Sequence, residues 1–185
     1  KAELPEGSAL DFSNVTAKAV SVAGTNVSSV TLSSTIEKFT ARGCEDLKEL
    51  SLEGNTSIKQ LDVSSTGLTS INANGCGNLE SLAFTGCKIA ASNVDLTGCE
   101  KLQTLNITGN SFLGFPYTKE DLPALTEFSG GNQTADLTWK PSDNSFNMSS
   151  VLNGTVANSA SAFAKIAATA SAKTAASTSD VSKVT

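Results

Sequence analysis

The sequence predicts a mainly β, right-handed solenoid with strand-like halves on both sides of each coil and little helix. Three observations lead to this prediction. Apolar residues recur at fixed offsets in nine consecutive segments, most of them ten or eleven residues long. A glycine stands at a constant place in most of these segments. Aromatic residues make up only 5% of the chain, so the interior has to be built from smaller aliphatic side chains.

The repeat is clearest between residues 47 and 87. When its first leucine is position 1, apolar residues occupy positions 1, 4 and 6, glycine occupies position 8, and asparagine, cysteine or threonine occupies position 9. From Val27 onward the segments begin 9 to 12 residues apart. The apolar members of the nine segments are Ala17, Val20, Val22; Val27, Val30, Leu32; Ile36, Phe39, Ala41; Leu47, Leu50, Leu52; Ile58, Leu61, Val63; Leu68, Ile71, Ala73; Leu79, Leu82, Phe84; Ala91, Val94, Leu96; and Leu102, Leu105, Ile107.

An eleven-residue apolar repeat is also compatible with a right-handed helical coiled coil. Glycine recurs in seven of the nine segments, and each glycine costs a helix about 1 kcal/mol relative to alanine. The step from position 4 to position 6 matches the two-residue period of a strand, and glycine at position 8 permits a sharp bend. Each segment is therefore expected to form a short strand and a corner, and two segments make one coil.

The pattern L-x-x-L-x-L-x-x-[N/C] resembles the leucine-rich repeat. The resemblance covers about residues 17–110, with an extension to 139 left open. Because the pattern occurs twice per coil, the chain looks like the nested 21-residue repeats of bacterial secreted and cell-surface proteins. The resemblance implies that position 9 is an inward ladder whose side chains hydrogen-bond loop backbone. A β-solenoid outside the leucine-rich-repeat family is the alternative.

The repeats divide the chain into four expected parts. Residues 1–16 are an N-terminal cap, residues 17–110 hold nine half-repeats, residues 111–140 are a C-terminal cap, and residues 141–185 are a Ser/Thr/Ala-rich tail or the start of a further module. Thr118 is expected to cap the start of a short helix that Pro123 ends. The residues expected to cover the two ends are Leu10 and Phe12, then Phe112, Phe115, Tyr117, Leu125, Phe128 and Trp139.

All four cysteines, Cys44, Cys76, Cys87 and Cys99, occupy position 9. They form no C-x-x-C pair and the chain has no histidine, so a metal site is not expected. We interpret them as buried thiols of the ladder. Cys76 and Cys99 lie on the same side one coil apart, and only this pair is placed to form a disulfide.

Composition narrows the classes of partner. The formal net charge is −5 and no lysine or arginine cluster stands out, so neither nucleic acid nor an anionic membrane is an expected partner. The apolar runs are too short for direct membrane insertion. Low charge, abundant Ser and Thr and a single Met favour a secreted or cell-surface protein. We expect a monomer and no cofactor. Lys1–Pro5 has no apolar signal segment, so a leader is expected to have been removed.

Function is expected on the outward positions 3, 5 and 7 of the strands. We predict a non-catalytic module that recognises a protein or glycan; the alternatives are a structural spacer without a ligand and, less supported, an ice- or surface-adsorbing solenoid. The chain has no histidine and no G-x-S-x-G motif, so it is not expected to be an enzyme. One side is polar and acidic without basic residues, and its candidate ligand-binding residues are Glu49, Ser51, Glu53, Ser70, Asn72, Asn74, Asn93, Asp95 and Thr97.

Overall fold

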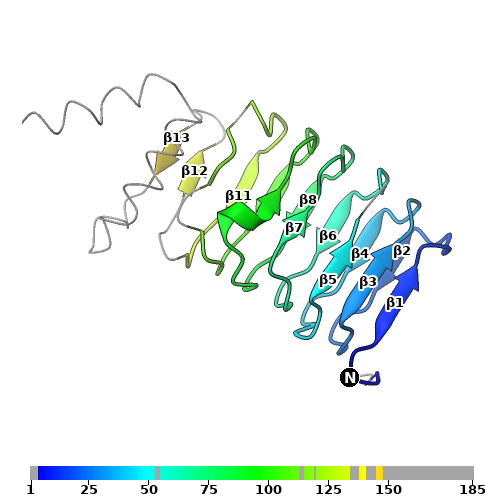
Figure 1. The fold of residues 1–185 in the computed structure, drawn as a ribbon. Helices are drawn as coiled ribbons and strands as arrows, with labels where there is room; N and C mark the ends of the chain where they lie inside the picture. The colour runs from blue at the N-terminus through cyan, green and yellow to red at the C-terminus, as the bar shows by residue number, and fades with distance from the viewer. Residues whose placement is uncertain are drawn as a thin grey trace, which may run out of the picture.

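The computed structural model describes residues 4–52, 55–112, 115–118 and 120–133, together with the backbone of Thr138–Lys140 and Ser145–Asn147. Short parallel strands alternate between two sides and stack along one axis, so the chain winds as a solenoid with its first strand at one end (Figure 1). The predicted mainly β solenoid is confirmed. In the described part of the chain, the only helix is the 3-10 helix η1 (Ala91–Asn93).

One side of the solenoid carries a six-stranded parallel sheet, and we call its outward surface the continuous face. Equivalent positions of successive coils lie opposite one another: Leu61 pairs with Leu82, and Leu82 pairs with Leu105. The strands of this sheet, in spatial order, are β2 (Ala19–Ser21), β4 (Lys38–Thr40), β6 (Gln60–Asp62), β8 (Ser81–Ala83), β10 (Thr104–Asn106) and β11 (Glu127–Ser129).

The opposite side carries two separate parallel sheets, and we call its outward surface the divided face. The sequence predicted strand-like halves on both sides of each coil, and both sides are built from strands. The first sheet of the divided face contains β1 (Ala9–Phe12), β3 (Ser29–Leu32) and β5 (Glu49–Ser51), and the second contains β7 (Ile71–Asn72) and β9 (Val94–Asp95).

Coil length varies although the register is kept. Val20 lies opposite Phe39, a coil of 19 residues, whereas Leu82 lies opposite Leu105, a coil of 23 residues. Strand pairing fixes which side chains face inward, because a slip of one residue would turn every apolar side chain to the solvent. The corners between strands therefore absorb the differences in length.

Positions 1, 4 and 6 form the interior, as predicted. Ala17 is exposed, which corrects its placement in the core, and Val20, Leu50 and Ala91 are only partly buried. Ala17 and Val20 belong to the first described segment of the six-stranded side, where no earlier coil covers them. The other apolar members of the repeat are buried and form one cluster along the solenoid. Each fully buried aliphatic side chain stabilises the fold by about 1.5–3 kcal/mol.

Position 8 bends the backbone as the glycine pattern predicted. Gly43 has a φ of 73°, in the left-handed region that side chains disfavour, and the other described glycines at this position have similar values. Ser65 occupies the same position in another segment and adopts a φ of 55°. Ser34, at position 8 of the segment that begins at Val27, has no positive φ. The left-handed bend therefore occurs in most segments, and glycine is the residue that makes it without strain.

Position 9 forms the inward ladder that the resemblance implied. Asn110 donates from Nδ2 to the carbonyls of Phe84 at 2.7 Å and Ile107 at 2.8 Å, and its Oδ1 accepts from the Ile89 N–H at 3.0 Å. Cys87 occupies an equivalent place and donates its thiol to the Val63 carbonyl at 3.3 Å. These side chains satisfy buried backbone groups at the corners, where strand pairing ends.

At the C-terminal end, Tyr117 covers the backbone of β9. Its hydroxyl accepts from the Leu96 N–H at 2.8 Å and donates to the Val94 carbonyl at 3.0 Å. Phe115 lies between Tyr117 and Phe128, with ring centroids 5.5 and 4.9 Å away. These aromatic residues pack against the last coil, in the region where the sequence placed the cap.

The prediction of a short helix after Thr118 is wrong for residues 120–124, which form turns and a bend. Thr118 and Asp121 do exchange hydrogen bonds as in a helix cap: the Thr118 N–H donates to Asp121 Oδ2 at 2.7 Å, and the Asp121 N–H donates to Thr118 Oγ1 at 3.4 Å. Pro123 follows and cannot donate to an earlier carbonyl, so the turn does not continue into a helix.

Beyond this end the chain forms β12 (Thr138–Lys140) and β13 (Ser145–Asn147), which pair in antiparallel orientation. Strand β12 lies at the end of the region to which the extension of the repeat was left open. The side chain of Trp139, expected in the C-terminal cap, lies outside the described residues. Of the expected tail, 141–185, the structure describes only the backbone of β13. The boundaries of the two caps and of the tail stay predictions.

Candidate functional site

The predicted ligand-binding residues lie on the divided face, in two groups. Glu49 and Ser51 belong to β5, in the first sheet. The remaining described candidates lie on or beside β7 and β9, where Asn72 pairs with Asp95. Glu53 lies outside the described residues. The sheet pairing therefore brings the second group together and leaves Glu49 and Ser51 in a different sheet.

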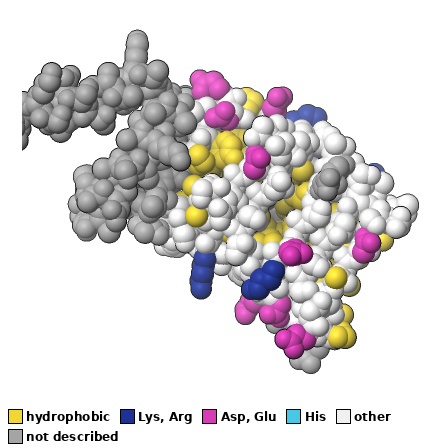
Figure 2. All heavy atoms as spheres, in the orientation of Figure 1, with side chains coloured by type: hydrophobic (Ala, Val, Ile, Leu, Met, Phe, Trp, Pro, Cys, Tyr) yellow, Lys and Arg dark blue, Asp and Glu magenta, His cyan; other side chains and the backbone are white. Residues whose placement is uncertain are grey.

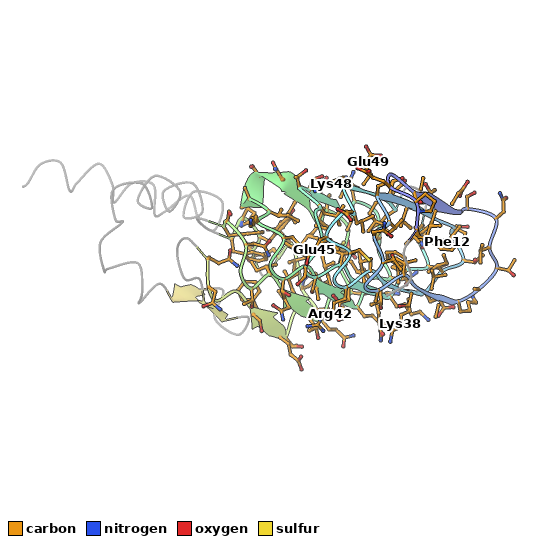
Figure 3. All side chains as sticks on the ribbon, turned by 90° about the horizontal axis from the view of Figure 1, so that it is seen from below. Phe12, Lys38, Arg42, Glu45, Lys48 and Glu49 are labelled. Atoms are coloured by element: carbon orange, nitrogen blue, oxygen red, sulfur yellow. The ribbon has the colours of Figure 1, made fainter. Side chains whose placement is uncertain are left out.

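Figure 3 places Glu49 on the opposite side of the solenoid from Lys38 and Arg42. The two faces consequently carry different charges. The outward positions of β5, β7 and β9 include the acidic Glu49 and Asp95 but no lysine or arginine. The surface seen in Figure 2 is mainly uncharged, with acidic side chains at separate points and few basic ones.

Several candidates on the divided face are engaged in hydrogen bonds within the protein. Asn72 Oδ1 accepts from the Asn74 N–H at 3.1 Å, and Asp95 Oδ1 accepts from the Thr97 N–H at 2.9 Å. Asn74 Nδ2 also donates to Asp95 Oδ2 at 3.2 Å. The bond from the Thr97 N–H is the main cause that lowers the pKa of Asp95 below its usual value. These side chains stabilise the ends of β7 and β9.

Asn93 has a similar structural role. Its Nδ2 donates to the Thr69 carbonyl of the preceding coil at 3.1 Å, and its Oδ1 accepts from the Ser92 hydroxyl at 3.2 Å. A ligand on this part of the divided face would meet polar groups that already have partners. Any binding there would rely on their remaining lone pairs and donors.

The continuous face holds a shallow depression of about 240 Å³ over β4, β6 and β8. Its floor is the backbone of Phe39 and Leu61, whose side chains are buried on the inner side of the sheet. The outward side chains that line it are Lys38 and Thr40 from β4, Gln60 and Asp62 from β6, and Ser81 and Ala83 from β8.

These six residues stand at the outward positions 3 and 5 of their segments, where the sequence predicts that function lies, but none of them is among the candidates named from the sequence. The hollow arises because the short side chains of Ser81 and Ala83 stand beside the longer Lys38 and Gln60. The change from long to short outward residues between adjacent coils was the signal available in the sequence. It becomes readable only when the register that aligns Lys38 with Gln60 and Gln60 with Ser81 is known.

Charged residues form an alternating row along one edge of the continuous face. Glu37 Oε1 lies 2.8 Å from Lys18 Nζ, and Glu37 Oε2 lies 2.8 Å from Lys59 Nζ. The hydrogen bond from Lys18, followed by the one from Lys59, lowers the pKa of Glu37 to about 2. All three groups are solvent-exposed, so this row adds little to stability and mainly fixes where the charges lie.

The four cysteines are free and buried, in agreement with the interpretation as ladder thiols. Burial, reinforced by the neighbouring Cys76 and Asp95, raises the pKa of Cys99 to about 12. Cys99 donates its thiol to the Ala73 carbonyl at 3.2 Å. A thiol of this kind is a poor nucleophile and a poor metal ligand at neutral pH.

No group of three or more potential metal-ligating side chains is found in the described ranges. No helix within the same ranges has the length and apolar character that a bilayer span requires.

Comparison with known proteins gives one distant relationship. No family model matches the chain, and no solved structure matches it significantly. The chain is similar to Protein BRASSINOSTEROID INSENSITIVE 1 of Arabidopsis thaliana. The two are 29% identical over 119 residues, which cover 52% of this chain and 10% of the plant protein. That relative is a leucine-rich-repeat protein, so the similarity agrees with the repeat and with the solenoid. The chain spans about a tenth of the length of that relative.

Proposed function

We propose that this chain is a non-catalytic binding module of a secreted or bacterial cell-surface protein, and that it recognises a protein or a glycan through an exposed sheet face. The observation that carries the proposal is the stacking of parallel strands, which repeats outward polar side chains from coil to coil on both sides of the molecule. An extended partner that crosses the strands would meet equivalent positions at each step of about 4.8 Å.

The similarity to a leucine-rich-repeat protein supports a repeat module of this general kind. The nested, twice-per-coil form of the repeat supports the bacterial secreted or surface setting. The nine candidates of the divided face remain one proposed binding surface. The depression of the continuous face is a second.

A structural spacer is the alternative function. It is favoured by two kinds of internal hydrogen bond. Asn72 and Asp95 bond the backbone two residues further on, and the bonds from Asn74 to Asp95 and from Asn93 to the Thr69 carbonyl join neighbouring coils. A spacer would display a neighbouring module and would bind nothing through either face.

The test begins with a screen of the purified chain against a glycan array and a panel of extracellular proteins. A combined variant with Glu49→Gln, Asn72→Ser and Asp95→Asn then examines the divided face. These changes remove charge and amide groups but keep hydrogen-bond acceptors at positions 72 and 95, so the fold is retained. We expect the screen to find a partner, and loss of that partner in the variant would assign the divided face. A screen without any partner would contradict the binding function and favour the spacer.

A further inference from the structure

We propose that the depression over β4, β6 and β8 binds an acidic carbohydrate, with Lys38 pairing with a sugar carboxylate and the surrounding polar side chains taking sugar hydroxyls. This inference rests on the proposed binding function. It adds the face that binds and the chemical class of the ligand.

The first support is that several polar side chains of the depression have no hydrogen-bond partner among the described residues. The side chains of Lys38, Thr40, Gln60 and Ser81 line the depression and make no hydrogen bond or ion pair with other residues that the structure describes. Asp62 is the exception in the lining, because its Oδ1 accepts from the Ser64 N–H at 3.0 Å and its Oδ2 lies 3.9 Å from the Arg42 guanidinium. These groups differ from their counterparts on the divided face, several of which are bonded to the protein itself.

The second support is the distribution of charge. Lys18 Nζ and Lys59 Nζ each form an ion pair with Glu37 at 2.8 Å, and the Arg42 guanidinium lies 3.9 Å from Asp62 Oδ2. Lys38 is therefore the cation of this region that has no acidic partner among the described residues. The chain as a whole carries a formal charge of −5. An anionic ligand in the depression would therefore pair with Lys38, since the carboxylate in the lining, Asp62, lies 3.9 Å from Arg42.

The third support separates a carbohydrate from an acidic peptide. A peptide that adds to a sheet needs a free strand edge, but β4, β6 and β8 are interior strands with a neighbour on each side. A protein partner also tends to need aromatic or apolar anchors, and the outward lining of the depression contains none besides Ala83. Ammonium, hydroxyl, amide and carboxylate groups on a shallow floor suit a ligand covered with hydroxyls.

The probe for the test is the trimer of galacturonic acid, measured by calorimetry against the intact chain. The neutral galactose trimer and a Glu-rich hexapeptide of similar length are the competing probes. Lys38→Gln removes the proposed carboxylate partner, and Ala83→Gln fills the hollow without changing charge. Lys48→Gln is the matched control, because Lys48 lies on the opposite side of the solenoid (Figure 3).

We expect the acidic trimer to bind the unmodified protein and the neutral trimer to bind more weakly. Lys38→Gln and Ala83→Gln should each weaken binding about tenfold or more, since a hydrogen bond to a charged group is lost or the ligand is displaced. Lys48→Gln should leave binding unchanged.

Three results would overturn the inference: no binding of the acidic trimer, an equal effect of Lys38→Gln and Lys48→Gln, or tighter binding of the peptide than of the trimer. After any of these results, the proposed function still holds if the screen finds another partner and Lys38→Gln does not change the affinity for that partner. The absence of a partner from the screen and from these probes would end both.

Discussion

Replacing Asn110 with alanine should destabilise the protein far more than its size suggests. Asn110 is 6% exposed and bonds three backbone groups that belong to buried residues. After Asn110→Ala, the Ile107 carbonyl keeps the side-chain amide of Gln133 as a donor. The Phe84 carbonyl and the Ile89 N–H lose the partners described above. A buried backbone group without a partner costs about 1–3 kcal/mol, so two of them predict a loss of about 2–6 kcal/mol.

Cys76→Ala is the matched control. Cys76 holds the same position in the repeat and is 1% exposed, but its thiol has no hydrogen bond to the rest of the described chain. The change removes a single methyl-sized atom from a packed site, which costs about 0.5–1.5 kcal/mol. The control therefore gives the cost of truncating position 9 where no hydrogen bond is lost, for one side-chain atom against the three that Asn110→Ala removes.

The free energy of unfolding of both variants can be obtained from guanidinium denaturation followed by far-UV circular dichroism. Small domains are stable by about 5–15 kcal/mol, so Asn110→Ala should move the midpoint strongly or prevent folding. If Asn110→Ala lost no more stability than Cys76→Ala, the ladder would not be stabilising the corners through its hydrogen bonds. The physical account of position 9 would then be wrong.

Three further predictions follow from the same geometry. Gly67→Ala should destabilise the fold in thermal melts by about 1–3 kcal/mol, because its Cβ would press on the Glu45 carbonyl, whereas Gly77→Ala should be nearly neutral because its Cβ meets the Gly98 carbonyl at 3.5 Å. Equal melting temperatures would refute this contrast. The pKa of Glu37 is lowered to about 2 from 4.5, so the stability from its ion pairs is present above pH 4.5 and is lost as pH falls toward 2. Because these pairs are solvent-screened, the free energies of unfolding of Glu37→Gln and the unmodified protein should differ by a small amount at pH 6 and converge at pH 2; a difference that does not change with pH would count against it. Ellman's reagent should label no cysteine in the native protein at pH 8 and all four in denaturant, since all are free and buried; two reactive thiols after denaturation would indicate an oxidised pair.

The repeat was predictable because its physical requirements recur at every coil. A strand of three residues must turn positions 4 and 6 inward, and the bend at position 8 favours glycine, so both leave a regular trace in the sequence. The segment that contains Gln133 departs too far from the pattern to be recognised as a repeat from the sequence. The amide of Gln133 takes the place of Asn110 one coil later, donating to the Ile107 carbonyl and accepting from the Phe112 N–H at 3.1 Å. The segment beginning at Leu125 has Gly130 at position 6 and glutamine at position 9, so only its spacing could have marked it.

The shape and hydrogen bonding of the two faces were harder to predict from the sequence, because they depend on side chains that come from different coils. The apolar repeat is the same on both sides, but the strand order shows a continuous sheet on one side and two shorter sheets on the other. The hydrogen bond between Asn74 and Asp95 likewise could not be inferred from their outward positions. Register decides whether an amide meets a carboxylate one coil away, and variable corners make that register hard to count from sequence alone.

The two faces of the solenoid differ in how freely their outward side chains can be exchanged during evolution. A side chain that closes a strand end or bridges two coils cannot be exchanged without a cost in stability, which constrains Asn72, Asn93 and Asp95. The outward side chains of β4, β6 and β8 contribute less to stability, because the sheet beneath them is continuous and its backbone pairs from coil to coil. Lys38, Gln60 and Ser81 can therefore change identity with little effect on folding. A binding surface needs that freedom, and for this reason the continuous face is where recognition should be sought first.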